Sequence, residues 1–184
     1  AIAAQSPISD QEIEDIVETV LTYVPSAFNS QSTRMVLLLG ENHLKLWEIV
    51  KETLRNRVSS KDFAQTEAKI DNCFACGYGT ILFFEECEIV EGLQASFPTY
   101  RDNFPVWSSQ TSAMHQLITW IMLEDAGFGA SLQHYNPLID EAVLKAWELP
   151  QSWKLIAQMP FGIPTGEISE KDVEDLNKRM KVFK

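Results

Sequence analysis

The sequence predicts an α+β fold, in which several amphipathic helices pack against a small number of buried strands. Two short runs, Met35 to Leu39 and Thr80 to Phe84, carry no charge and have the length of buried strands. Apolar residues elsewhere recur at helical spacing. The 184 residues are enough for a sizeable core, and no linker or repeat divides them. We therefore expect residues 1–184 to form a single domain.

The first half of the chain is expected to alternate between helix and strand. Ser9 to Glu12 has the pattern of a capping box and opens a helix that ends near Tyr23. After the strand that ends at Leu39, apolar spacing predicts a second helix to about Arg57. The polar stretch 59–71 is weakly helical, and residues 85–95 predict a helix interrupted by Gly92.

The centre of the chain holds the longest helical run, Ser109 to Asp125. Between Met114 and Leu123 its apolar residues cover nearly every face, which predicts a helix that is buried on all sides and also reaches a subunit interface. The preceding stretch, 97–107, contains two prolines and four aromatic residues. It is expected to form a structured loop or a lid over a pocket, or alternatively to pack its aromatic side chains on the core.

The last part of the chain is expected to be less regular. Residues 128–133 read as a short strand or extended segment, and residues 140–147 as a helix. A third strand is predicted from Trp153 to Gln158, ended by Met159 and Pro160. Residues 171–184 are expected to form a helix that runs into an extended tail.

Composition and charge exclude several function classes. The formal net charge of −11 argues against a broad nucleic-acid interface, which needs a basic face. No run of about 18 apolar residues is present, so no membrane span is expected. The first ten residues lack the basic and apolar regions of a signal peptide. Three cysteines give an odd count and no disulfide framework, so a reducing, cytoplasmic location is expected.

No group of residues indicates a metal site or a protein nucleophile. Cys73 and Cys76 form a C-x-x-C pair, but it precedes a strand, so two buried apolar thiols are expected instead of a redox or zinc site. His43 is expected at the surface at a helix start, and His115 in the core or at an interface. His134 is the histidine of most interest. The chain has no nucleophile elbow, phosphate-binding loop or dinucleotide-binding glycine pattern.

The stretch from Val24 to Leu39 is the strongest candidate for a binding site. A short loop rich in Ser, Asn and Gln leads from Pro25 directly into a buried strand, so its polar groups are held at fixed positions. Such a loop suits a flat ligand with a polar rim, such as a flavin ring. The alternative is that the amide side chains satisfy the backbone of their own loop.

Four stretches, in the same order, resemble the nitroreductase family and most closely its small branch from fungi and some bacteria. They are PSAFNSQS before an apolar strand, GYGTILFFEE at Gly77 to Glu86, GFGASLQHYNPLID at Gly127 to Asp140, and KVFK at the C-terminus. The resemblance implies a nitroreductase-like mixed sheet flanked by helices, in an intertwined homodimer whose two copies exchange elements. It also implies flavin mononucleotide (FMN) as the cofactor.

The resemblance implies an FMN-dependent oxidoreductase that takes reducing equivalents from NAD(P)H and passes them to nitroaromatic, quinone or similar acceptors. An alternative is a flavin-binding regulatory or stress-response protein with little turnover. A third possibility, from another class, is a dimeric interaction protein without a cofactor.

The resemblance also assigns residues to the site, with no catalytic side chain among them because the flavin carries the chemistry. One subunit is expected to contribute Pro25, Ser26, Ala27, Asn29 and Gln31. The other is expected to place Gly129, Ala130, Ser131, Leu132 and Gln133 beside the ring. Lys69 is expected at the pyrimidine edge of the ring, and Lys181 and Lys184 at the phosphate.

One departure from the family concerns the phosphate. Nitroreductases usually carry an Arg- and Ser-containing motif near the N-terminus that holds it, and this sequence has no Arg before Arg34. Two expectations follow. Either a short N-terminal segment is missing from this sequence, or the phosphate rests on the C-terminal lysines and Arg34.

Overall fold

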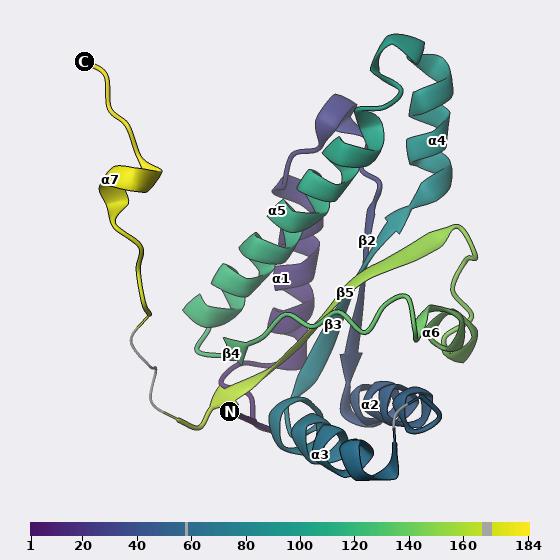
Figure 1. Cartoon of the computed structure of the whole chain (residues 1–184), viewed down its shortest axis with the longest axis vertical. Coiled ribbons are helices and arrows are strands. Elements are labelled where there is room, and N and C mark those ends of the chain that lie inside the picture. The colour runs from purple at the N-terminus through teal and green to yellow at the C-terminus, as the bar shows by residue number, and fades with distance from the viewer. Residues whose placement is uncertain (58, 167–170) are drawn as a thin grey trace.

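The centre of the computed structural model, which describes residues 1–57, 59–166 and 171–184, is an antiparallel sheet (Figure 1). Its strands run in the order β1–β5–β3–β2, and β4 pairs with β5. Their bounds are Ile2–Ala3 for β1, Thr33–Leu39 for β2, Gly79–Glu86 for β3, Gly129–Ala130 for β4 and Trp153–Pro164 for β5. The predicted α+β class is confirmed, and all strand pairs in the described residues are antiparallel.

Helices flank this sheet on both faces (Figure 1). The helices of the described residues are α1 (Asp10–Tyr23), α2 (Gly40–Arg55), α3 (Ser60–Ile70), α4 (Cys87–Ser96), α5 (Phe104–Asp125), α6 (Asp140–Ala146) and α7 (Leu176–Arg179), of which α7 lies apart from the sheet. Three short turns of other helix types complete the list: η1 (Ala27–Asn29), η2 (Asp71–Ala75) and η3 (Pro98–Tyr100). The predicted capping box at the start of α1 is present, since Ser9 and Glu12 each bond the other's backbone N–H.

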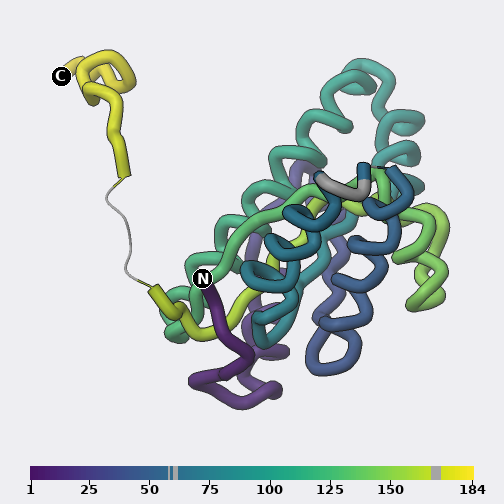
Figure 2. The backbone as a smooth tube through the Cα atoms, turned by 60° about the horizontal axis from the view of Figure 1, so that its bottom comes forward, coloured from purple at the N-terminus to yellow at the C-terminus, as the bar shows by residue number. Residues whose placement is uncertain are grey.

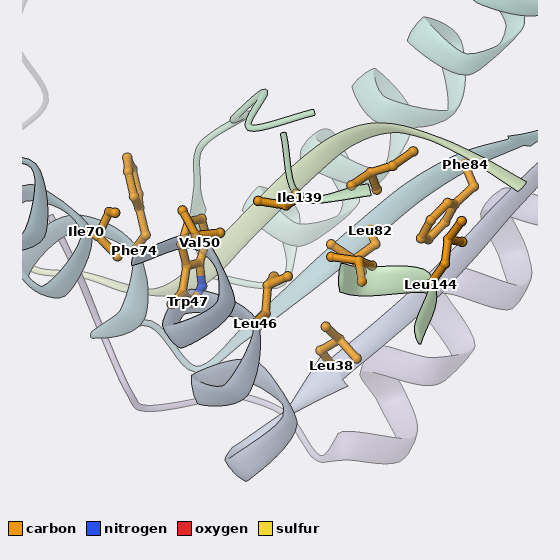
Figure 3. Packing of buried hydrophobic residues seen from close by; sticks show 12 residues of the cluster. Leu38, Leu46, Trp47, Val50, Ile70, Phe74, Leu82, Phe84, Ile139 and Leu144 are labelled. Carbon is orange, nitrogen blue, oxygen red and sulfur yellow. The ribbon is translucent and has the colours of Figure 1, made fainter. Parts of the chain in front are cut away.

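Two hydrophobic clusters lie on opposite faces of β3 because successive side chains of a strand point to opposite sides. Leu82 and Phe84 join residues of α2, η2 and α6 in one cluster, in which Trp47 is fully buried (Figure 3). Ile81 and Phe83 face the other way, toward α1 and the C-terminal end of α5. The uncharged run predicted as a buried strand is therefore buried from both sides.

The third strand is longer than predicted. β5 continues through Pro160 to Pro164, so the expected end at Met159 and Pro160 is wrong. In an antiparallel strand the N and C=O of one residue point to the same side. Pro160 O accepts a bond from Ser131 N at 3.1 Å, on the side away from β3, so the missing N–H of Pro160 removes no bond to β3.

The stretch 97–107 is not the single loop that was predicted. It holds η3 and the first turn of α5, where Pro105 is favoured because an N-terminal helix position needs no N–H donor. Its aromatic rings pack on one another and on Phe28, with Phe97 at 5.0 Å and Phe104 at 5.2 Å between ring centroids. The expected break of α4 at Gly92 is also wrong, because the helix is continuous from Cys87 to Ser96.

The expectation that α5 is buried on every side is wrong for the single chain. Its polar residues Thr111, Ser112, His115 and Thr119 are buried. Apolar residues in its middle face outward, although Phe104 and Leu123 near its two ends are buried. Leu117 is 58% exposed and Ile121 is 50% exposed. This helix therefore buries its polar side and presents its apolar side at the surface of the chain.

The C-terminal segment 171–184 lies apart from the rest of the chain in both views (Figures 1 and 2). Its helix, α7, covers only Leu176–Arg179, so the predicted helix is shorter than expected. All residues of the segment are exposed, including Phe183 at 94%. Among the described helices none is both long and apolar enough to cross a membrane.

Candidate functional site

The loop between α1 and β2 has an unusual backbone conformation. The φ angles of Phe28, Asn29 and Gln31 are 58°, 51° and 47°, in the left-handed region that residues with a Cβ rarely adopt. The loop is closed by Asn29 N and Ser30 N, which donate to Ser26 O and Ala27 O, and by Gln31 N, which donates to Ser26 Oγ at 3.0 Å. Strained conformations of this kind concentrate at functional sites.

Arg34 fastens this loop to the sheet. Its Nη1 donates to Gln31 O at 2.7 Å and to Thr33 O at 3.1 Å, and the guanidinium lies 6.0 Å from the centre of the Trp153 ring. Both hydrogens of Nη1 are therefore used on backbone carbonyls. A phosphate at Arg34 would have to bond the remaining nitrogens of the guanidinium.

The side-chain amides of Asn29 and Gln31 are exposed and accept or donate no hydrogen bond to any residue that the structure describes. The loop is braced by its backbone, by Ser26 Oγ and by Arg34 instead. The alternative that these amides satisfy their own loop is therefore not what the structure shows. Both groups remain available to a ligand.

A pocket of about 270 Å³ lies beside this loop, between α1, β2 and α5. Its polar lining comes from Ser26, Gln31, Thr33, Arg34 and His115. The buried His115 bonds Thr111 O through Nδ1 at 2.9 Å, and a carbonyl only accepts, so Nδ1 carries the hydrogen. His115 thus lies inside the fold with one ring nitrogen satisfied by its own helix.

A second pocket of about 410 Å³ lies on the other side of the loop. Ala27 and Phe28 line it together with Trp107, Gln110, Thr111 and Met114 of α5. Pro25 lines a third, apolar groove between α1 and α5. Four of the five loop residues that were predicted to bind flavin, Pro25, Ser26, Ala27 and Gln31, therefore line pockets beside α5, whereas Asn29 lines none of these three.

Residues 129–133 run along β5 and are firmly held. Gly129 and Ala130 pair with Gly162 and Phe161, and Ser131 N bonds Pro160 O. Gln133 and Gln158 exchange two backbone hydrogen bonds, of 2.7 Å and 2.9 Å. The segment is half-buried, and His134, which follows it, is exposed.

The two predicted halves of the flavin site lie toward opposite ends of the sheet (Figure 1). Thr33, which follows the loop, is in register with Glu85, and Glu85 is in register with Lys154. Gly129 pairs with Gly162. Lys154 and Gly162 are eight positions apart on β5, which is about 26 Å at the rise of an extended strand. Gln133, at the other end of the segment, pairs with Gln158, which is four positions or about 13 Å from Lys154. One chain does not bring the two halves together.

The predicted lysines are also distant from the loop. Lys69 is exposed on α3, 5.8 Å from the centre of the Phe74 ring, at the end of the sheet where β3 begins. Lys181 and Lys184 are exposed on the C-terminal segment, apart from the sheet (Figure 2). In one chain, Lys69 shares an end of the sheet with Gly129.

Two residue predictions are wrong. Cys73 is exposed and Cys76 is only half-buried, so the pair is not two buried thiols. Burial still raises the pKa of Cys76, whose Sγ lies 3.3 Å from Ile2 O, and that of Cys87. His43 starts a helix as expected but is 1% exposed rather than at the surface. Thr80 of β3 and Ala75 of η2 bond its ring and cover it.

Sequence reasoning missed Glu85, which was assigned to the start of a helix. The structure places it in β3, 4% exposed, with hydroxyl groups of Ser32, Thr33 and Ser108 bonded to its carboxylate. An acidic residue at the end of an apolar strand, matched by a Ser-Thr pair at the start of another, is the signal that could have found it.

Among the described residues no group of three or more His, Cys, Asp and Glu side chains could hold a metal ion.

The chain matches the model of the nitroreductase family over residues 3–163. It is 32% identical over 160 residues to nitroreductase FRM2 of Saccharomyces cerevisiae, covering 87% of this chain and 78% of that protein.

Solved structures agree with this match. Nitroreductase CinD from Lactococcus lactis in complex with nicotinic acid has a TM-score of 0.91 and 42% identity, covering 100% of this chain and 93% of that one. The same enzyme in complex with chloramphenicol has a TM-score of 0.88 and 43% identity, covering 100% of this chain and 95% of that one.

Proposed function

Since the chain belongs to the nitroreductase family and is thereby an oxidoreductase, we propose that it is an FMN-dependent enzyme that passes reducing equivalents from NAD(P)H to nitroaromatic, quinone or similar acceptors. The observation that carries this proposal is the loop 25–31, held by hydrogen bonds, whose Asn29 and Gln31 amides have no partner among the described residues. A flavin supplies hydride chemistry when it is bound.

The residues present fit a flavin ring. Its rim alternates hydrogen-bond donors and acceptors, and the Asn29 and Gln31 amides each offer both. Ser26 and Ala27 are small, so the backbone of the loop is open to a flat ligand. The loop does not depend on these amides for its own conformation, because backbone bonds, Ser26 Oγ and Arg34 hold it.

We also propose that the site is completed by a second copy of the chain. Within one chain the loop 25–31 is separated from the segment 129–133, which starts at the far end of the sheet and ends beside Gln158 in the middle of β5. The outer face of α5 offers a surface for pairing: it is apolar, and with α1 it borders a groove of about 380 Å³. Residues 171–184 are exposed and lie apart from the sheet of their own chain (Figure 2). This segment is therefore placed to pack on a second copy of the chain.

The acceptor class follows from chemistry near the loop and from a relative. The rings of Phe97, Tyr100 and Trp107 pack on Phe28 of the loop, and aromatic faces favour planar aromatic ligands. CinD has been solved with nicotinic acid, with chloramphenicol and with 4-nitrophenol. A small aromatic acceptor is therefore proposed for this chain.

The test is spectroscopic and then kinetic. The purified full chain is mixed with FMN, freed of unbound flavin and scanned in the visible range, and the bound flavin is then reduced by NADH or NADPH without oxygen. We expect a yellow protein whose flavin is reduced by one of these nucleotides and reoxidised faster when a nitroaromatic or quinone is added. A colourless protein would contradict flavin binding. A yellow protein whose flavin no nicotinamide nucleotide reduces would favour the regulatory alternative.

A further inference from the structure

Glu85, in β3, is buried and accepts hydrogen bonds from three hydroxyl groups. Its Oε2 accepts from Ser32 Oγ and from Ser108 Oγ, each at 2.7 Å, and its Oε1 accepts from Thr33 Oγ1 at 2.6 Å. The hydroxyls come from the residue before β2, from β2 itself and from α5. No ion pair of Glu85 is found in the part of the chain that the structure describes.

A buried carboxylate without a cationic partner is expensive for a fold, and a packed apolar side chain would fill the space without that penalty. Both oxygens of the Glu85 side chain accept hydrogen bonds from hydroxyl groups. Short O–H···O⁻ bonds are about twice as strong as those between neutral groups. Glu85 therefore fixes the positions of the three side chains that donate to it.

Two of those side chains belong to the residues that directly follow the candidate loop. Ser32 and Thr33 come immediately after Gln31, and Ser32 O also accepts from Glu86 N at 2.8 Å. Three residues of the loop have a positive φ, and such backbone conformations are kept only where several surrounding contacts hold them. Glu85 supplies that constraint from the inner side of the loop, and Arg34 supplies it through the carbonyl of Gln31.

We propose that Glu85 is a positioning residue for the cofactor site: through Ser32 and Thr33, it holds loop 26–31 in the conformation that presents Asn29 and Gln31 to the flavin ring. Glu85 acts through its neighbours and is not a catalytic residue. The inference rests on the proposed function, because it assigns the purpose of the loop to flavin binding.

The first test measures flavin affinity of the full chain with Glu85→Gln. Apoprotein is titrated with FMN and, separately, with riboflavin, and the change in flavin fluorescence gives each Kd. We expect both Kd values to rise at least tenfold and by the same factor, because the loop meets the ring and not the phosphate. Glu91→Gln is the matched control: Glu91 is exposed in the same pocket as Glu85 and has no hydrogen-bond partner among the described residues. It should leave both Kd values unchanged.

A second measurement separates positioning from general stability. Amide hydrogen exchange of residues 26–31 should become faster in Glu85→Gln, while exchange in β3 and the dimer fraction stay as in the wild type. The pair Ser32→Ala and Thr33→Val should reproduce the loss of flavin affinity, whereas Ser108→Ala, which removes the bond to α5, should change it less. If Glu85→Gln does not fold, the same flavin titrations and hydrogen-exchange measurements are made on Thr33→Val instead.

The outcomes are distinct. A wild-type chain that binds no flavin would refute the proposed function. A wild-type chain that binds flavin, together with a Glu85→Gln variant of unchanged Kd and unchanged loop exchange, would refute only this inference. An equal loss of affinity in Ser108→Ala and in the Ser32→Ala and Thr33→Val pair would also overturn it, because the effect would then not run through the loop.

Discussion

Asn29 and Gln31 are the two residues whose side chains should respond most clearly to a ligand, because both lie on a hydrogen-bonded loop and their amides bond no other residue that the structure describes. Replacing either with Leu should weaken flavin binding by about 1–3 kcal/mol, since ring atoms would be left buried and unpaired. Titration of apoprotein with FMN measures this. Melting temperature and oligomeric state should not change, because the amides do not brace the loop.

Gln11→Leu is a suitable control for these variants, since Gln11 is an exposed amide at the start of α1, bonded to Asp15. It should bind flavin as the wild type does. Unchanged affinity in both loop variants would mean that the amides do not meet the flavin, and the site would have to be sought elsewhere around the loop.

His43 should make the stability of the fold depend on pH. Its Nε2 faces Ala75 O and must carry the hydrogen, so Nδ1 accepts from Thr80, whose oxygen accepts from Trp47 Nε1. Burial lowers the pKa of His43, while the bond to Ala75 opposes that shift. Because its folded pKa is below that of the unfolded chain, the unfolded state binds more protons as the pH falls below about 6.5.

The stability contributed by neutral His43 is therefore complete above the ordinary pKa of histidine and is lost as the pH falls through the lower folded pKa. The slope from this one proton cannot exceed about 1.4 kcal/mol per pH unit. Urea unfolding of the wild type and of His43→Gln, measured across this range, should show a smaller decline in the variant. His134→Gln, at an exposed histidine, should keep the wild-type slope. Parallel curves for the wild type and His43→Gln would contradict the prediction.

Residues whose surroundings are distant in sequence could not be placed by pattern alone. His43 starts an amphipathic helix, which predicts exposure, but its partners Thr80 and Ala75 are 37 and 32 residues away. Glu85 is similar, because its role depends on Ser32 and Ser108. The loop before β2 was located correctly, since its polar composition and the buried strand after it are both local features. The flavin role of its residues remains a proposal.

At the scale of elements, the sequence pattern located α1, α2, β2 and β3 within a few residues, because each helix buries one apolar face and each strand is a continuous uncharged run. The pattern could not predict that β5 continues through Pro160. A strand tolerates proline there only because the backbone N and C=O of Pro160 face Ser131 and not β3. The apolar residues of α5 predicted a helix buried on all sides. In the single chain its polar residues are buried, and Leu117 and Ile121 are exposed.

The C-terminal segment carries the proposed phosphate ligands, Lys181 and Lys184. Truncation after Met180 should reduce the preference for FMN over riboflavin at least about tenfold, or 1.4 kcal/mol, because a charge-assisted bond to the phosphate is lost. Riboflavin affinity should change much less. The two dissociation constants of the truncated and full chains measure the effect. A truncated chain with its full preference would direct attention to Arg34 or to a segment before Ala1.

At the scale of the whole molecule, the surface of a single chain has a feature that soluble monomers rarely show. Met114, Leu117, Ile118 and Ile121 form an exposed apolar face of α5 beside Tyr23 of α1. A contiguous apolar patch of this kind marks an interaction site. Together with a site whose halves lie at opposite ends of the sheet, it favours an obligate homodimer in the large, hydrophobic class of interfaces.

Charge on this face should therefore dissociate the molecule. Ile118→Lys combined with Leu117→Lys should convert a dimer into a monomer in sedimentation, because two buried ammonium groups would oppose pairing. Leu44→Lys is the control, since Leu44 is an exposed leucine on α2, far from α5. A wild-type chain that sediments as a stable folded monomer at micromolar concentration would contradict the dimer and the shared site together.

Mixed dimers would test whether the two halves of the site come from different copies. One copy carries Asn29→Leu with Gln31→Leu, and the other carries Lys69→Glu; each homodimer should bind flavin weakly. If each site takes its loop from one subunit and Lys69 from the other, a mixed dimer has one intact site and one that is doubly damaged. It should then bind one flavin at wild-type affinity. If both halves of each site came from one subunit, every site in the mixed dimer would be damaged, and no tight flavin binding would return.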